Sequence, residues 1–498
     1  MIVPSHKVLS GMRRELSVAF PGPHAEGSVG QALTSSVRAL EVRERGGTAF
    51  VQSRLDTLEV LIGQLTSLPF NTPAWKSGLR DLKAQLPQAR RHACLQELEA
   101  AHTEVLTATE RLMTDMIANP SLTIDDRTQL LEILSTWEIA DRRALTTLPN
   151  EGEEIDTTIT QEKLERYLQQ RFSEPAMKVT QFQPLAGGFG KQTILLEVDG
   201  KALSGSLVLR RDIGAPSVGN DCHWVREEYR VIRAAFERGF PAPEALWLDT
   251  QHALLPGGDF IVMRRAAGET GGNVFRSKGA VSDELFKVLA EGMARLHTMP
   301  PCVELGDLTS SIRTEEWKLT IPQSVKRYIE EWLGIYLRET HNPSPTLVSL
   351  YGWLLANVPR ADGTPVLLHG DIGFHNMLVE EGRLSVVVDW EFAHVGDPAE
   401  DLGYVKNIIG DADWDKLLRF YRAAGGAEVD PVRLHFFQVW AHVRNASASN
   451  LALGAFEAGK HDNLKLVHSG HFHFPLFAKT ACDLIAAGPH GKIKAVDY

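Results

Sequence analysis

The chain has 498 residues, of which 43% are apolar and 23% are charged, a composition typical of globular protein with two to four domains of roughly 100–200 residues each. Its apolar runs are short, and residues 1–20 lack the apolar core of a secretion signal, so we expect no membrane partner. A net charge of −11 disfavours nucleic acid as a partner. The four cysteines are far apart and form no CxxC pair, which fits a cytoplasmic location without a zinc site or a disulfide framework.

The N-terminal third reads as helix. Leu58, Leu61, Ile62 and Leu65 follow helical spacing, and breakers such as Gly46-Gly47 and Pro87 divide the segment. We therefore predict an all-α helical bundle over residues 1–148. Dimerisation into a homodimer, regulation and substrate presentation all remain open as its role. Residues 149–177 read as a linker and a lead-in helix, for which Thr160 is the expected N-cap.

Short strands begin at Lys178, and residues 178–268 are predicted to form a nucleotide-binding lobe. Between the first two strands lies a glycine-rich turn that contains Gly187, Gly188 and Gly190 and is followed by Lys191. Glycines let backbone N–H groups approach phosphate oxygens without a Cβ clash. We therefore assign these four residues to cofactor binding, although a lysine in such a loop is more often solvated than bound to phosphate.

A basic residue, Arg210, ends the third strand of this lobe, where it can reach nucleotide phosphates. A carboxylate is needed to fix it, and the helix predicted over residues 222–238 offers Glu228, with Glu227 as the rival. Met263 ends a later apolar run, at the point where the chain leaves the sheet. The backbone there is expected to hydrogen-bond the edge of an adenine ring.

Residues 269–498 are predicted to form a catalytic and substrate-binding lobe. An apolar run delivers His369-Gly370-Asp371, Asn376 follows five residues later, and a second apolar run delivers Asp389. Transfer of a phosphoryl group to a hydroxyl needs one carboxylate for the nucleophile and oxygen ligands for magnesium. Asp371 is therefore the expected catalytic base, and Asn376 and Asp389 are the expected Mg²⁺ ligands. His369 is expected to hold the loop.

Other acidic residues follow this site. Glu391 can contact a metal or cap its turn. Asp397 resembles an N-cap, with Glu400 completing a capping box, and the remaining Asp401 is expected to brace the catalytic loop. Farther on, three histidines lie near a proline, at positions 468, 471 and 473. They allow a metal site, although histidines on the face of a helix are the simpler interpretation.

Several segments, taken together, resemble the aminoglycoside phosphotransferase and choline kinase superfamily: His369-Gly370-Asp371, Asn376, Asp389-Trp390-Glu391, and Gly396-Asp397-Pro398 with Asp401-Leu402-Gly403-Tyr404. The resemblance covers residues 178–486 and is nearest the branch associated with acyl-CoA dehydrogenases, in which an arginine such as Arg210 replaces the lysine of protein kinases. It implies an α+β, bilobal, protein-kinase-like fold, with a small β-rich N-terminal lobe and a helical C-terminal lobe after the all-α helical bundle. It also implies ATP and Mg²⁺ as cofactors.

These observations favour an ATP- and Mg²⁺-dependent kinase that phosphorylates a hydroxyl of a small molecule. The resemblance points to a hydroxy acid or its coenzyme A thioester as acceptor. An aminoglycoside, a macrolide or a choline-like cation is the alternative acceptor, and a non-catalytic nucleotide-binding regulator is the alternative function. The sequence leaves the choice between ATP and GTP open, and Ile372 to His375, which face the acceptor, are unassigned.

Overall fold

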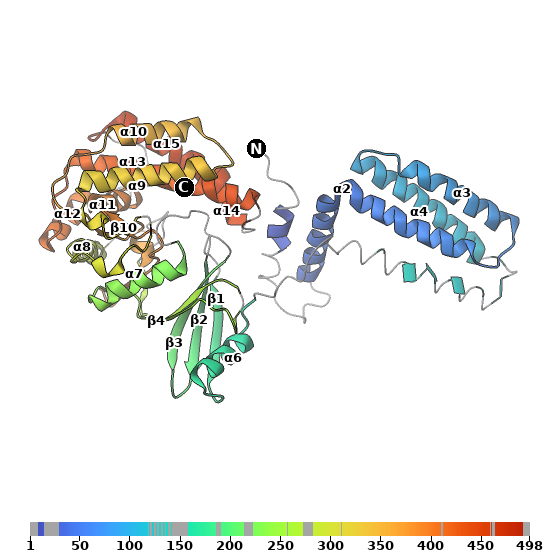
Figure 1. Cartoon of the computed structure of the whole chain (residues 1–498), viewed down its shortest axis with the longest axis horizontal. Helices are drawn as coiled ribbons and strands as arrows, with labels where there is room; N and C mark the ends of the chain where they lie inside the picture. Colours follow the sequence, from blue (N-terminus) through green and yellow to red (C-terminus); the bar gives the residue numbers. More distant parts are fainter. Residues whose placement is uncertain are drawn as a thin grey trace. The chain divides into compact units, whose positions relative to one another are not determined.

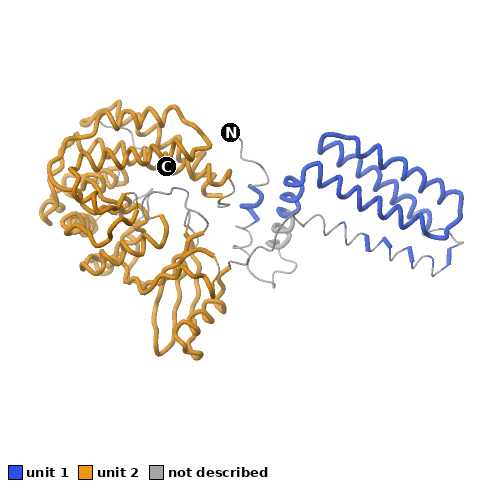
Figure 2. Tube along the Cα trace, viewed as in Figure 1, with its two compact units in different colours: residues 1–154 blue, residues 155–498 orange. Residues whose placement is uncertain are grey.

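The computed structural model describes residues 8–13, 29–117, single positions between 119 and 141, and residues 158–185, 191–213, 223–255, 257–271, 282–309, 311–409, 412–458, 460 and 464–491. The chain forms two compact units, residues 1–154 and residues 155–498 (Figure 2). Within the described residues, every helix is too short or too polar to cross a membrane.

The first unit contains the long helices α2 (Val29–Thr66), α3 (Pro73–Ala89) and α4 (Leu95–Ile117). Leucines at helical spacing on α2, including Leu58 and Leu61, are fully buried in the core of this unit. The predicted break at Gly46-Gly47 is a kink inside α2, because only Gly47 leaves helical geometry (φ 51°, ψ −134°). Glycine reaches that positive φ without a Cβ penalty, so the helix bends and continues.

The second unit begins with α6 (Gln161–Phe172), whose predicted N-cap is confirmed, since the Thr160 hydroxyl accepts a hydrogen bond from the N–H of Lys163 at 3.2 Å. A five-stranded antiparallel sheet follows, in the order β1-β2-β3-β5-β4 (Figure 1). Its strands are β1 (Lys178–Leu185), β2 (Lys191–Asp199), β3 (Gly205–Asp212), β4 (Ala245–Asp249) and β5 (Phe260–Arg264). Helix α7 (Val225–Glu237) connects β3 to β4.

Alternating side chains give this sheet two different faces. Ile194, Leu196, Leu207 and Leu209 pack with α6 in a small core. The neighbouring Val208 points to the other face, where it joins the main core with α7 and the C-terminal lobe. The side chain of Arg210, two residues beyond Val208, therefore lies on the face that meets the C-terminal lobe.

The C-terminal lobe is mainly helical, with three short strand pairings. Its helices are α8 (Asp283–His297), η2 (Val303–Leu305), η3 (Glu316–Lys318), α9 (Ile321–Glu339), α10 (Pro345–Ala356), η4 (Phe374–Asn376), α11 (Ala399–Ile408), α12 (Trp414–Ala423), α13 (Pro431–Glu457), α14 (Leu464–His468), η5 (Ser469–His473) and α15 (Phe474–Ala487). The strands β6 (Glu269–Thr270), β8 (Met377–Glu380) and β9 (Arg383–Val387) form one sheet, and β7 (Val366–Leu368) pairs with β10 (His394–Gly396).

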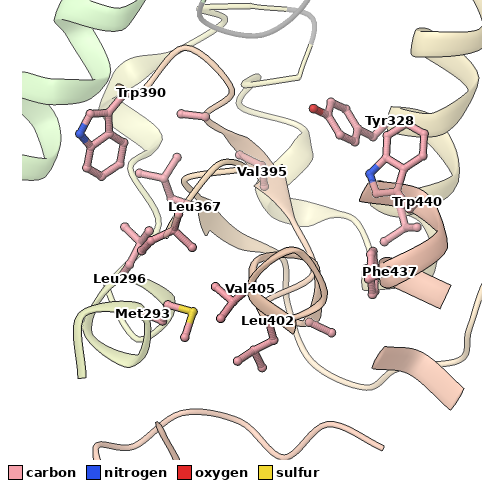
Figure 3. Close-up of a cluster of buried hydrophobic side chains, with 14 of the residues drawn as sticks. Met293, Leu296, Tyr328, Leu367, Trp390, Val395, Leu402, Val405, Phe437 and Trp440 are labelled. Atoms are coloured by element: carbon pink, nitrogen blue, oxygen red, sulfur yellow. The ribbon is translucent and has the colours of Figure 1, made fainter. Parts of the chain in front are cut away.

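The core of this lobe lies directly beneath the strand ends that carry the predicted site. Side chains from α8, β7, α11 and α13, among them Met293, Leu367, Leu402 and Trp440, converge there (Figure 3). The predicted fold class is thereby confirmed: helices, then a β-rich lobe, then a helical lobe in a bilobal kinase-like arrangement. The finer boundaries at residues 148, 177 and 268 stay predictions.

Candidate functional site

The loop after β7 is shaped by its own backbone and by the chain opposite it. Gly370 has a φ of 79°, and a Cβ atom there would lie 2.4 Å from the carbonyl oxygen of Phe392, so only glycine fits. The fully buried ring of His369 spans the loop. Its Nε2 lies 3.0 Å from the carbonyl oxygen of Val388, and its Nδ1 accepts from the N–H of Asp371 at 3.3 Å. His369 holds the loop, as predicted.

Asp401 supports the same loop from below. Its carboxylate accepts hydrogen bonds from the N–H groups of His369 (3.2 Å) and Gly370 (2.9 Å). The Nε2 of His297 lies 3.1 Å from the same carboxylate. Burial alone would raise the pKa of Asp401, but the contact with His297 outweighs it and holds the pKa below its ordinary value. The expectation that Asp401 braces the catalytic loop is confirmed.

Asp371, the expected base, is held by residues of its own loop and of α11. The amide nitrogen of Asn376 donates to the backbone oxygen and to Oδ2 of Asp371, both at 3.0 Å. The amide oxygen of Asn376 is then the atom left to face a cation. Burial would raise the pKa of Asp371, but the neighbouring side chains of His375 and then Tyr404 outweigh it and lower the pKa. Asp371 is therefore ionised at neutral pH, as a proton acceptor must be.

Tyr404 belongs to a segment that carries the family resemblance, but sequence reasoning assigned it no role in the site. It lies three residues after Asp401 on α11, so both side chains point from the same helix face toward the catalytic loop. Burial, followed by the charge of the neighbouring Asp371, raises the pKa of Tyr404 well above its ordinary value. The spacing from Asp401 is the signal that would have found it.

Asp389 lies just beyond β9 and meets Arg210 from the N-terminal lobe. Asp389 has a φ of 67°, a left-handed conformation that is strained for a non-glycine residue and is often retained at functional sites. The Nη2 of Arg210 lies 2.5 Å from its Oδ1, while the Nε of Arg210 lies 3.0 Å from Oε2 of Glu228. The predicted pairing with Glu228, rather than with Glu227, is confirmed. Its role on nucleotide phosphates stays a prediction.

Lys191 corrects the expectation of a solvated loop lysine. It is the first residue of β2, it is only 6% exposed, and its ammonium donates to the backbone oxygen of His223. The Lys191 Nζ also lies 3.4 Å from Asp212 and 3.7 Å from Glu391. The physical reason is the strand register, which pairs Lys191 with Asp212 on β3 and turns the side chain inward.

Glu391 lies two residues after Asp389 and faces two cations, since Arg210 Nη2 is also 3.7 Å from its Oε2. Burial and then the charge of Asp389 raise the pKa of Glu391 to about 7. Within the described residues, the carboxylate has these two cations as its partners, and no backbone N–H of the turn donates to it. Whether it contacts a metal stays a prediction.

A cavity of about 380 Å³ adjoins these groups, within the size range of small-molecule sites. Its charged lining residues include Arg210, Glu228 and Asp389, together with Arg264 and Arg265. Apolar residues from both lobes also line it: Leu185, Leu195, Val208, Met263, Ala266, Leu378, Val386 and Val388. A flat aromatic ring and a polyphosphate fit a cavity with both apolar and charged lining. Gly187, Gly188 and Gly190 lie outside the described residues.

Only half of the predicted capping box at Asp397 and Glu400 forms. The Asp397 carboxylate accepts from the N–H of Ala399 at 2.8 Å, as an N-cap does, and it also accepts from Arg433, which donates to both of its oxygens. Glu400 does not complete the box, because it lies 3.3 Å from Arg444 and accepts from the indole of Trp440 at 2.9 Å. Both carboxylates are buried, and each pairs with a cation inside the lobe.

Two of the three histidines near the C-terminus, His468 and His473, contact each other and neighbouring phenylalanines. The ring of His468 stacks on Phe472 and meets His473 edge-on, with centroids 5.0 Å and 4.9 Å apart. No group of three histidine, cysteine, aspartate or glutamate side chains in the described part of the chain is arranged to hold a metal ion. The simpler interpretation, helix-face histidines, fits this geometry.

A model of the phosphotransferase enzyme family matches residues 181–437. Among curated relatives, acyl-CoA dehydrogenase family member 11 of Gallus gallus is 26% identical over 320 residues, which are 58% of this chain and 39% of that protein. The chain therefore spans well under half the length of this relative. Viomycin phosphotransferase of Streptomyces vinaceus is 43% identical over 67 residues, 13% of this chain and 22% of that one.

Solved structures with a similar fold include a thermostable mutant of aminoglycoside phosphotransferase APH(4)-Ia in a ternary complex with AMP-PNP and hygromycin B. It is 18% identical, covers 62% of this chain and 99% of its own, and superimposes with a TM-score of 0.43.

Proposed function

Because this chain belongs to the phosphotransferase enzyme family, we propose that it transfers the γ-phosphoryl group of ATP, with Mg²⁺, to a hydroxyl group of a small molecule. One observation carries the proposal. Arg210 joins Glu228 of the N-terminal lobe to Asp389 of the C-terminal lobe, at 3.0 and 2.5 Å, and all three line the 380 Å³ cavity. A guanidinium with five donors in one plane can hold both carboxylates and still face a phosphate.

Asn376 and Asp389 are the residues that would hold Mg²⁺. Magnesium prefers oxygen ligands, and the Asn376 amide nitrogen is already used on Asp371, which leaves its amide oxygen for the cation. The Asp389 carboxylate is a third exposed, so a ligand can reach it. When bound, the cation neutralises the negative charge of the phosphates.

The protein's own groups supply the rest of the chemistry. Asp371 is ionised and lies at the mouth of β7, where it accepts the proton of the acceptor hydroxyl. As the bond from that oxygen to the γ-phosphorus forms, the bond from the γ-phosphorus to the β–γ bridging oxygen breaks, and ADP leaves. Arg210 balances charge on the phosphates, and the His369–Asp401 support keeps the loop in place. Transfer is direct, since the base faces the acceptor and no phosphorylated residue is required.

We propose a hydroxy acid or its coenzyme A thioester as the first acceptor class to test. Its support is the similarity to acyl-CoA dehydrogenase family member 11 over 320 residues. An antibiotic hydroxyl is the second candidate, supported by the 43% identity with viomycin phosphotransferase over a short segment.

The test is a panel assay with MgATP, 3-hydroxybutyrate, its coenzyme A thioester, viomycin and hygromycin B. We expect one class to yield a product heavier by one phosphoryl group. Asp371→Asn should lower kcat by about 10²-fold or more, because the amide cannot accept the proton. Nucleotide binding without transfer to any member of the panel would favour a regulatory role, and an adenylylated product would identify a different reaction.

A further inference from the structure

We propose that His375 is a positioning residue for the base Asp371. The inference rests on the proposed function, and it assigns a role to one residue of the segment Ile372 to His375, which the sequence analysis left unassigned. The Nε2 of His375 lies 3.6 Å from Oδ1 of Asp371, on the side of the carboxylate opposite the amide of Asn376, which binds Oδ2. The two side chains therefore approach the two oxygens of Asp371 separately.

The imidazole has no competing role within the described residues. Its side chain is only 10% exposed, and neither Nδ1 nor Nε2 has a hydrogen-bond partner there. A buried donor without an acceptor is rare and costly in proteins, so one that persists requires an explanation. The Asp371 carboxylate lies 3.6 Å from Nε2, a distance slightly too long for a hydrogen bond. Such contacts in ligand-free enzymes often tighten when the substrate binds.

Gly373 leaves the space that the imidazole ring of His375 occupies. A Cβ atom on Gly373 would lie 2.8 Å from Nδ1 of His375 and 2.6 Å from Cδ1 of Ile408, so the ring occupies space that any other residue at 373 would fill. Tyr404 limits the other side, with its ring centroid 6.5 Å from that of His375. His375 is thus fixed beside Asp371 by packing.

The His375 ring affects the orientation of the Asp371 carboxylate relative to the acceptor hydroxyl. A carboxylate held only through Oδ2 can rotate about its χ2 bond, which moves the lone pair that must meet the acceptor hydroxyl. A donor at Oδ1 limits that rotation, and small errors in such geometry lower rates strongly. Removal of the donor should therefore lower kcat and leave nucleotide affinity unchanged.

The test compares His375→Phe, which keeps the ring and removes the N–H groups, with His375→Gln, which restores a donor. On the best acceptor of the panel, we expect His375→Phe to lower kcat by about 10-fold at unchanged KM for ATP, with partial recovery in His375→Gln. The matched control is His471→Phe, because His471 is exposed and distant in sequence. It should change nothing.

Gly373→Ala supplies an independent arm. It should lower kcat by displacing the ring, and it should add nothing in the His375→Phe background, since contacting residues that act together are not additive. Wild-type kcat in His375→Phe, or equal losses in His375→Phe and His375→Gln, would overturn this inference alone. A wild-type chain that transfers no phosphoryl group at all would overturn the proposed function with it.

Discussion

Two networks of charged side chains lie within the second unit, and they use the same residue types in different ways. The interlobe network joins Lys191, Arg210, Glu228, Asp389 and Glu391. The loop-support network joins His297, Asp397, Glu400, Asp401, Arg433 and Arg444. The first links strands and helices of both lobes, whereas the second lies wholly within the C-terminal lobe.

The two networks differ in the solvent exposure of their carboxylate side chains. The side chains of Asp389 and Glu391 are 33% and 26% exposed, whereas those of Asp401 and Glu400 are 0% and 4% exposed. Each carboxylate of the loop-support network is satisfied by partners inside the lobe. The interlobe network keeps carboxylate oxygen atoms within reach of a ligand. The proposed site therefore differs from the loop-support network in having carboxylate oxygens that its own partners do not fully cover, and not in its charge.

The largest expected effect comes from the loop-support network. Arg444→Met removes the buried cation beside Glu400 and the hydrogen bond to the carbonyl oxygen of Gly370. An uncompensated buried charge costs about 3–5 kcal/mol, so the free energy of unfolding should fall by that amount in a urea titration. The control is Arg422→Met, whose exposed pair with Glu428 should contribute less than about 1 kcal/mol. Equal losses of unfolding free energy in Arg444→Met and Arg422→Met would show that the buried network is no more important for stability than an exposed ion pair.

The helix that carries Arg433 and Arg444 also carries His442, a buried imidazole without a counter-ion in this part of the lobe. Burial lowers the pKa of His442 from 6.5 to about 4. The unfolded chain then binds the proton at a higher pH than the folded chain, so stability is lost as pH falls from 6.5 to about 4. The loss approaches about 3 kcal/mol at full protonation.

His442→Phe should remove this loss. The free energy of unfolding, measured by urea titration at pH 7 and at pH 5, should differ less between the two pH values in His442→Phe than in the wild type. An identical difference in both proteins would show that His442 does not titrate in this window.

The interlobe network should respond in activity more than in stability. Arg210→Lys keeps the charge, but a single ammonium cannot reach Glu228 and Asp389 as two guanidinium nitrogens do. We expect the KM for MgATP to rise about 10-fold, equal to about 1.4 kcal/mol, with little change in the unfolding midpoint. Arg233→Lys, at an exposed position of the same helix as Glu228, is the control. An unchanged KM for MgATP in Arg210→Lys would show that Arg210 does not contribute to nucleotide binding.

The contrast between the networks also explains what the sequence predicted. Arg210 and Glu228 were predictable as a pair, because a strand end and the following helix must pack against each other in a small sheet. The loop role of His369 was predictable from its position beside a sharp glycine turn. That of Asp401 was predictable because Asp401 was the acidic residue left over once Asp397 and Glu400 were assigned to the helix start. In each case the partners lie on elements whose order is evident from the pattern of apolar residues.

The errors share one cause. A capping box and a buried ion pair place the same acidic residues at the start of a helix, and only burial against Arg433 and Arg444 tells them apart. Lys191 was misjudged because its depth depends on strand register and on Glu391, far along the chain. Tertiary contacts between distant residues decide these roles, and local spacing does not contain them.

The most direct test of the central claim is phosphoryl transfer by Asp389→Asn. Asp389 belongs to the interlobe network and is partly exposed, so this change should leave the thermal unfolding midpoint of the whole chain near that of the wild type. We predict that transfer from [γ-³²P]ATP to the acceptor then falls by about 10²-fold or more, because the variant loses a carboxylate that faces the phosphates. Wild-type transfer by a folded Asp389→Asn protein would contradict the account.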